Sequence, residues 1–212
     1  MRRYIKYLPK IINPFLYVLY FLVYLIPRKR TSWVFGSGVG MNFSDNAKYL
    51  FLYCSEQLDI KSYWISKNKE LVNTLRSYGL NAYYKFSFKG IWISITSKVY
   101  VYDSRTESIN HWTSAGTYKV NLWHGSPLKT IDRDIKVKHN AFYIGNHTRG
   151  FKRYLVRMVM PEWFVVADFM IATSAKIKDY FKSAFGSHYI ELTGYPRNDI
   201  IVNPKLYSKY RM

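Results

Sequence analysis

A regular alternation of short apolar runs with amphipathic stretches limits the folds open to this chain more than any other feature. The apolar runs have the length of buried strands, and the stretches between them show helical periodicity and capping residues. The expected strands cover residues 32–35, 63–66, 81–86, 98–102, 118–123, 169–172 and 189–192. The expected helices cover residues 44–58, 70–78, 90–96 and 174–185. The alternation predicts an α/β fold, a Rossmann-like parallel sheet with helices on both faces.

An apolar run near the N-terminus, residues 11–27, carries no charged residue and is flanked by Arg and Lys on both sides. It is at the short limit of what spans a bilayer, and basic flanks at both ends disfavour spanning. Its tyrosines are typical of interfacial depth. We therefore expect residues 1–30 to form a membrane-associating segment with an apolar helix. A buried core helix is the alternative.

The charge balance indicates an anionic partner: 32 Lys and Arg against 13 Asp and Glu give a formal charge of +19. Nucleic acid, anionic lipid and phosphate-rich substrates all meet that condition, and a general gain in solubility is the alternative. No nucleic-acid recognition motif is present, so we expect no nucleic acid as partner. The single cysteine, Cys54, excludes an intrachain disulfide and a Cys-based zinc site.

Residues 130–165 interrupt the alternation, and we expect them to form a basic amphipathic insertion. Within them, residues 151–160 read F-K-R-Y-L-V-R-M-V-M, with basic and apolar positions at helical spacing. Such a helix is typical of proteins that lie on anionic lipid. The alternative is an ordinary solvated face over a core stripe.

Three motifs follow expected strands, at residues 36–40, 124–129 and 194–199. Ligands of open α/β sheets bind outside the carboxyl ends of the strands, so the motifs are expected to share a site. The first reads G-S-G-V-G, whose backbone N–H groups can cradle a phosphate, and a plain strand-to-helix turn is an equal alternative. Its spacing is not that of the dinucleotide fingerprint, which argues against NAD.

The segment 121–129 reads N-L-W-H-G-S-P-L-K and offers the clearest chemistry. A histidine beside a hydroxyl acceptor can act as general base because its pKa lies near neutrality, and Lys129 can stabilise phosphoryl charge. A lone histidine is more often structural, but the strand-end position makes catalysis by His124 an equal alternative. The other histidines have no ligand spacing, so the sequence predicts neither a metal nor a cofactor.

These motifs resemble those of a known family. Residues 123–129, W-H-G-S-P-L-K, resemble the W-H-G-T-P-L-K signature of the CDP-glycerol glycerophosphotransferases, the primases and polymerases of wall teichoic acid. Residues 33–36 and then 43–50 resemble the start of that family's pattern, and residues 193–199, T-G-Y-P-R-N-D, resemble its G-x-P-R-N-D element. The order and spacing agree, and the resemblance covers residues 31 to about 204.

The resemblance implies the N-terminal half of a GT-B-type glycosyltransferase fold, attached peripherally to the cytoplasmic face of the cell membrane. Residues 31–212 are then a Rossmann-like acceptor-side domain. Family members continue well beyond the arginine–asparagine–aspartate element, so we expect the C-terminal donor-binding domain to be absent from this chain and a separate donor-binding domain to be its partner. The chain would then carry half of an active site.

The implied activity is transfer of glycerol phosphate or ribitol phosphate from CDP-glycerol or CDP-ribitol to a lipid-linked polymer acceptor. It would serve the synthesis of teichoic acid or a related wall or capsule polymer. An acceptor hydroxyl would attack the β-phosphorus of the donor and release CMP. A non-catalytic module that binds anions or polymer on an anionic membrane surface is the alternative from another class.

The resemblance also implies roles for individual residues. His124 is expected to be the catalytic base. The residues expected to bind substrate are Asn46, Gly125, Ser126, Lys129, Arg197 and Asp199. Ser126 stands where the family usually has Thr and keeps the hydroxyl. Asn46 can alternatively cap its helix, and Arg197 can alternatively stabilise its loop.

Overall fold

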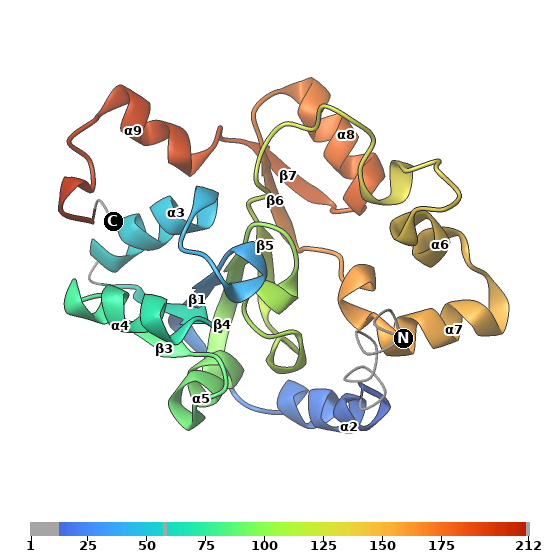
Figure 1. The fold of residues 1–212 in the computed structure, drawn as a ribbon, viewed down its shortest axis with the longest axis horizontal. Coiled ribbons are helices and arrows are strands. Elements are labelled where there is room, and N and C mark those ends of the chain that lie inside the picture. Colours follow the sequence, from blue (N-terminus) through green and yellow to red (C-terminus); the bar gives the residue numbers. More distant parts are fainter. Residues whose placement is uncertain (1–12, 57–58, 211–212) are drawn as a thin grey trace.

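The fold is built around a seven-stranded sheet in which all neighbouring strands are parallel (Figure 1). The computed structural model describes residues 13–56 and 59–210. The strands are β1 (Lys29–Gly36), β2 (Lys61–Ser66), β3 (Ala82–Tyr84), β4 (Ser97–Tyr102), β5 (Tyr118–Asn121), β6 (Phe169–Ala172) and β7 (Tyr189–Leu192). Their order across the sheet is β3-β2-β1-β4-β5-β6-β7. The order reverses between β1 and β4, which is the position where such sheets bind ligands.

Helices connect the strands, and shorter 3-10 helices occupy the loops. The α-helices are α2 (Asn13–Tyr24), α3 (Asp45–Glu56), α4 (Lys69–Ser77), α5 (Phe88–Thr96), α6 (Ala141–His147), α7 (Gly150–Val159), α8 (Ala175–Phe185) and α9 (Asp199–Val202). The 3-10 helices are η2 (Gly38–Gly40), η3 (Thr106–Ser108), η4 (His111–Thr113), η5 (Asp132–Asp134), η6 (Pro161–Phe164), η7 (Pro196–Asn198) and η8 (Ser208–Tyr210).

Helices cover both faces of the sheet. Successive side chains of a strand point to opposite faces, so each strand contributes to the core on both sides. On β4, Val101 joins the core cluster beneath α3 and α4, whereas Tyr100 joins the cluster beneath α5. On β6, Ile171 belongs to the first cluster, and Met170 packs with Phe181 of α8. Thus α3 and α4 cover one face and α5 and α8 the other, which confirms the predicted parallel α/β sheet.

The strands agree with the predicted ones, and two are shorter than expected. Strand β6 has its predicted bounds, whereas β3 ends at Tyr84 and β5 ends at Asn121. The Asn121 side chain explains the second difference. Its Oδ1 accepts the N–H of Trp123 at 2.9 Å, so the chain turns out of the ladder before that residue.

The glycine motif forms a strand-to-helix turn. The Gly38 N–H donates to the Asp103 carboxylate at 3.4 Å, and the Gly40 N–H donates to the Ser37 carbonyl at 2.8 Å. These two amides are therefore engaged inside the protein. The geometry agrees with the plain turn, which was the alternative to a phosphate cradle.

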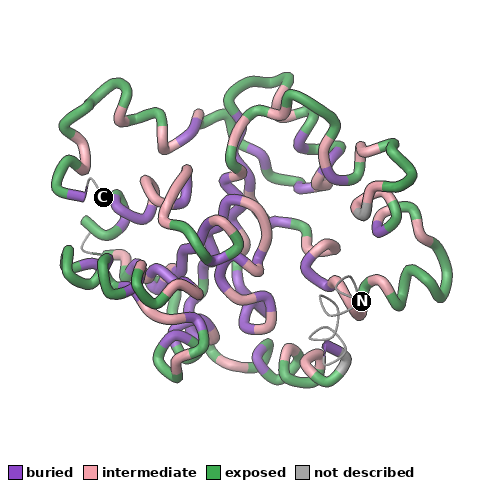
Figure 2. Tube along the Cα trace, in the orientation of Figure 1, coloured by how far each residue is buried: buried purple, intermediate pink, exposed green. Residues whose placement is uncertain are grey.

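The predicted apolar helix is present as α2, and its outer side is exposed (Figure 2). The large exposed apolar residues of α2 and the following turn are Phe15, Val18, Leu19, Phe21, Leu22, Tyr24 and Leu25. The inner side packs on η4, where the Tyr17 ring meets Trp112 at 5.4 Å. Among residues 13–56 and 59–210, no helix has both the length and the apolar character needed to cross a membrane. Residues 1–12 of the predicted segment lie outside the described part of the chain.

The insertion predicted at residues 130–165 contains α6 and α7 and is joined to the sheet by Arg105. This guanidinium forms an ion pair with Asp132 and lies over the Phe142 ring at 5.1 Å. It also donates to the Glu162 carbonyl at 3.4 Å. One side chain from the end of β4 therefore contacts the beginning, middle and end of the insertion.

Arg28, between α2 and β1, joins the exposed helix to the core. Its Nη1 donates to the carbonyls of Ser97 at 2.9 Å and Ser94 at 3.3 Å, near the end of α5. Its Nη2 donates to the carbonyls of Thr113 at 3.2 Å and Ala115, near the end of η4. Carbonyl groups at helix ends lack hydrogen-bond donors within the helix, and the Arg28 guanidinium provides donors for these four carbonyls.

Arg28→Met is expected to lower the free energy of unfolding by about 3 kcal/mol, because partly buried carbonyls lose charged donors. Urea unfolding followed by tryptophan fluorescence measures the change. The matched control is Lys29→Met, which removes the exposed neighbouring cation and should change stability by no more than about 0.5 kcal/mol. Equal effects of the two substitutions would contradict the role assigned to Arg28.

Candidate active site

His124 lies on a tight turn directly after β5. The preceding residue, Trp123, has a left-handed φ of 50°. A non-glycine residue in a sparsely populated region of this kind costs about 1–3 kcal/mol. The Trp123 ring packs against Phe185 of α8 at 4.6 Å and stacks on the His124 imidazole at 4.1 Å between ring centroids. This aromatic packing offsets the backbone strain and holds His124 at the carboxyl edge of the sheet.

Asn46, in the first turn of α3, fixes the same turn from the other side. The side chain is buried, and its Nδ2 donates to the carbonyls of Leu122 at 3.3 Å and Trp123 at 2.8 Å. Its Oδ1 accepts the backbone N–H of Arg197 at 3.4 Å. Both amide hydrogens are thus used inside the protein. The geometry favours a positioning role for Asn46.

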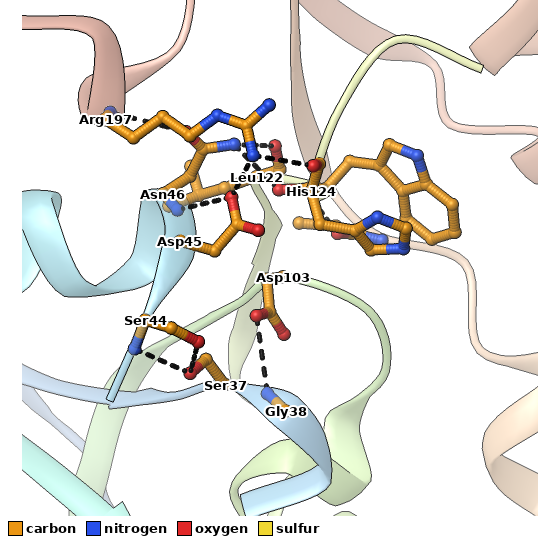
Figure 3. Close-up of polar contacts among 11 residues, drawn as sticks. Ser37, Gly38, Ser44, Asp45, Asn46, Asp103, Leu122, His124 and Arg197 are labelled. Atoms are coloured by element: carbon orange, nitrogen blue, oxygen red, sulfur yellow. Dashed lines mark hydrogen bonds and ion pairs between the residues drawn. The ribbon is translucent and has the colours of Figure 1, made fainter. Parts of the chain in front are cut away.

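Arg197, in the third motif, contacts the second motif and the first turn of α3 (Figure 3). Its Nη1 lies 2.9 Å from Asp45 Oδ1 and 2.9 Å from the His124 carbonyl oxygen. The guanidinium also lies over the Tyr195 ring at 5.4 Å. A partly exposed ion pair of this kind adds only about 0–1 kcal/mol of stability. Its consequence is geometric, because it ties together segments that are far apart in the sequence.

The partial burial of His124 favours the neutral imidazole. Partial burial lowers its pKa below the ordinary value of 6.5, Asp45 raises it, and Arg197 lowers it. A neutral imidazole has one ring nitrogen free to accept a proton. At neutral pH, His124 therefore has the protonation state that a general base needs.

His124 and Trp123 form part of the wall of a cavity of about 720 Å³. The predicted residue Lys129 also lines it, as do the neighbouring rings of Phe142 and Trp163, whose centroids are 4.9 Å apart. This volume is in the range that accommodates small-molecule ligands. The lining is mainly apolar and aromatic, and its charged residues are Arg105, Lys129, Glu107 and Asp132. Arg105 pairs with Asp132, so Lys129 is the cation of this wall that can meet a phosphate beside the neutral histidine.

The remaining predicted residues lie at different places. Gly125 backs onto Arg197, whose Nη2 would be 3.4 Å from an added Cβ atom. The Ser126 hydroxyl lies 3.3 Å from that of Thr173, after β6. Asp199 begins α9 and lines a separate cavity of about 540 Å³ beside Trp33. The structure thus gathers the predicted residues around His124, with Asp199 on another surface.

Asp103, directly after β4, was not identified from the sequence. Its carboxyl group is buried; Oδ2 accepts the Gly38 N–H, and Oδ1 has no hydrogen-bond partner among the described residues. Burial raises its pKa to about 6; the Gly38 N–H lowers the pKa and Asp45 raises it. Figure 3 places Asp103 between Gly38 and His124. The available signal was an acidic residue at the carboxyl end of an apolar strand.

Comparison with known proteins assigns the chain to a family. The family described as CDP-Glycerol:Poly(glycerophosphate) glycerophosphotransferase matches residues 18–211. The chain belongs to this family. It is 30% identical over 191 residues to a teichoic acid poly(glycerol phosphate) polymerase of Bacillus spizizenii, covering 87% of this chain and 45% of that protein. It is 29% identical over 204 residues to a teichoic acid glycerol-phosphate transferase of Staphylococcus aureus, covering 95% and 49%.

The fold is similar to that of the wall teichoic acid polymerase TagF, with a TM-score of 0.64 at 23% identity. That match covers 95% of this chain and 48% of the polymerase. This member of the glycerophosphotransferase family spans about half the length of the two curated relatives named above. The resemblance expected from the three motifs is confirmed.

Asn46→Asp is expected to destabilise the protein by about 2 kcal/mol, because a carboxylate would face the carbonyls of Leu122 and Trp123 with no hydrogen to donate. Urea unfolding measures the loss. Asn73→Asp, the same change at an exposed position of α4, is the control and should be nearly neutral. A stability equal to that of the unsubstituted protein would show that Asn46 does not hold the turn.

Arg197→Gln is expected to raise the pKa of His124, because a cation that lowers it is removed while Asp45 remains. Asp45→Asn is expected to shift the pKa in the opposite direction. The imidazole proton shifts of His124, followed by NMR against pH, measure both changes. Shifts of the same sign in the two variants would contradict the arrangement of charges described above.

Proposed function

We propose that this chain carries the acceptor side of a CDP-glycerol glycerophosphotransferase, with His124 as the catalytic base. The observation that carries the proposal is the neutral imidazole at the edge of a ligand-sized cavity, held there by Asn46 and Arg197. The family and the names of its members supply the chemistry. The relatives are teichoic acid polymerases and transferases of glycerol phosphate.

The proposed reaction is a single displacement at phosphorus. A ring nitrogen of His124 takes the proton from an acceptor hydroxyl, and the oxygen attacks the β-phosphorus of the donor. The bond between that phosphorus and the oxygen of the α-phosphate breaks, and CMP leaves with the electron pair. Lys129, which lies on the cavity wall, offsets negative charge on the phosphoryl oxygens. Arg197 acts by holding the His124 backbone.

We assign the donor to CDP-glycerol, with CDP-ribitol as the alternative, and its binding site to a separate domain of a GT-B-type arrangement. The solved structures support the first assignment, since a variant of TagF has been soaked with CDPG. The position of His124 at the open carboxyl edge supports the second. A donor-binding domain that faces this edge would bring the β-phosphorus to the imidazole.

The proposal includes peripheral attachment to the cytoplasmic face of the cell membrane, where a lipid-linked polymer acceptor would be reached. Its support is the exposed apolar side of α2 beside the basic and apolar helix α7. The two helices are in contact: the Asn13 side chain donates to the Val159 carbonyl at 2.8 Å, and the Tyr17 hydroxyl donates to the Arg157 carbonyl at 2.8 Å.

His124→Gln is expected to reduce CMP release from CDP-glycerol by a factor of about 10²–10⁴, the contribution of a general base. The measurement uses the protein together with its donor-binding domain and a lipid-linked acceptor. His188→Gln, at an exposed position after α8, is the control and should leave the rate unchanged. Equal rates for His124→Gln and the parent protein, with both folded, would refute the assignment of the base.

The same assay separates the enzyme from the non-catalytic alternative. A glycerophosphotransferase releases CMP only when donor and acceptor are both present. A polymer-binding module would bind the acceptor and release no CMP from CDP-glycerol or CDP-ribitol. The His124→Gln variant would then bind acceptor as well as the parent protein does.

A further inference from the structure

A small basic cavity lies at the amino end of the sheet, opposite the edge that carries His124. Its volume is about 310 Å³. It is lined by Tyr24, Ile26, Arg28, Arg30, Lys98 and Gly116. The residues come from the end of α2, the beginning of β1, the beginning of β4 and the turn before β5. No part of the proposed transfer reaction uses this cavity.

The cavity holds three cations without a balancing carboxylate. Within residues 13–56 and 59–210, none of the ion pairs involves Arg28, Arg30 or Lys98. The Arg28 Nε atom is buried and makes no hydrogen bond to the residues described. A buried polar group without a partner is unfavourable, and a cation in that condition favours the binding of an anion.

The shape of the cavity depends on Gly116. A Cβ atom added there would lie 3.4 Å from the Tyr24 ring and 3.6 Å from Arg28 Nε. The missing side chain therefore keeps this part of the cavity open, while the Arg28 Nε atom itself is buried. Gly116 has a φ of 70°, which most other residues adopt only with strain.

The cavity borders the exposed apolar side of α2. At 3.6 residues per turn, the exposed residues Phe15, Val18, Leu19, Phe21 and Leu22 share one side of this helix, and Tyr24 lies about 60° beyond Phe21, at the margin of that side. Tyr24 is 63% exposed and also lines the cavity. An amphipathic ring at such a margin is typical of the boundary between acyl chains and headgroups. The cations therefore lie where the headgroups would be if α2 rests in the bilayer surface.

We infer that this cavity binds the phosphate of an anionic phospholipid headgroup. The inference rests on the proposed membrane attachment and adds a defined lipid site to it. The cationic groups of Arg30 and Lys98 would bind the phosphate, and the Arg28 guanidinium in the cavity wall would add its positive charge. The adjacent Ile26 side chain and the Tyr24 ring favour a phosphate attached to a lipid over a free phosphate ion, since their apolar surfaces can contact the carbon atoms of a lipid.

The first test removes charge from the cavity. Arg30→Gln/Lys98→Gln is compared with Lys176→Gln/Lys182→Gln, which removes the same charge from α8 on the other side of the molecule (Figure 1). Binding is measured by co-sedimentation with vesicles of phosphatidylcholine, with and without phosphatidylglycerol. The cavity variant should lose about 30-fold in affinity for the anionic vesicles, at about fivefold per cation. The control should lose little. Equal losses would overturn the inference.

The second test keeps every charge and fills the space. Gly116→Asn adds a side chain beside Arg28 Nε, and asparagine tolerates the left-handed backbone. A defined headgroup site predicts weaker binding to phosphatidylglycerol vesicles at an unchanged thermal unfolding temperature. Affinity equal to that of the parent protein would mean that diffuse attraction between charges, and no cavity site, accounts for the preference.

Two further measurements distinguish a failure of this inference from a failure of the membrane attachment on which it rests. Phe21→Ser/Leu22→Ser should weaken binding to vesicles of both compositions. If the parent protein binds neither composition, the attachment itself is wrong. If it binds both equally, attachment stands and the lipid site is wrong. Inorganic phosphate serves as the soluble probe: if it binds to the cavity in calorimetry while anionic vesicles gain no affinity, the ligand is free phosphate and the lipid assignment fails.

Discussion

The two hydrogen bonds from the Asn46 amide to the carbonyls of Leu122 and Trp123 are the contacts on which the geometry of the site depends. Strand β5 ends at Asn121, so these carbonyls have left the sheet ladder and need other donors. A buried carboxamide meets that need and also accepts an N–H from the segment after β7. The ends of β5 and β7 are thereby fixed to the start of α3, and the position of His124 follows from that connection.

In the proposed function, the insertion between β5 and β6 connects the membrane surface to the cavity in which the reaction takes place. Its α7 contacts the inner side of α2, the helix whose outer side is apolar and exposed, and its Phe142 and Trp163 line the cavity next to His124. Arg105 holds this segment to the end of β4. An acceptor anchored in lipid would therefore meet one continuous segment on its way from the bilayer surface to the imidazole.

The sequence predicted the strands and helices of the sheet and the main residues around His124, because both depend on local signals. The apolar run of β6 and the capping residue Ser174 give their elements correct bounds. In a parallel sheet, strand ends meet at one edge, which brought His124 and Arg197 together correctly. The buried carboxyl of Asp103 and the contacts of Arg105 with the insertion could not be predicted. They depend on pairings between distant segments, and no spacing in the chain encodes those pairings.

The strained backbone of Trp123 has a consequence for how this protein can change over evolutionary time. The left-handed turn is kept by packing of the Trp123 ring against Phe181 and Phe185, residues of α8 that are absent from the cavity wall beside His124. A smaller side chain at either position would relax the turn and tilt the imidazole that stacks on the same ring. Substitutions at the aromatic positions of α8 are therefore restricted by the geometry of His124, which lies more than fifty positions earlier in the chain. Substitutions at these aromatic positions should be inherited together with compensating changes around residue 123.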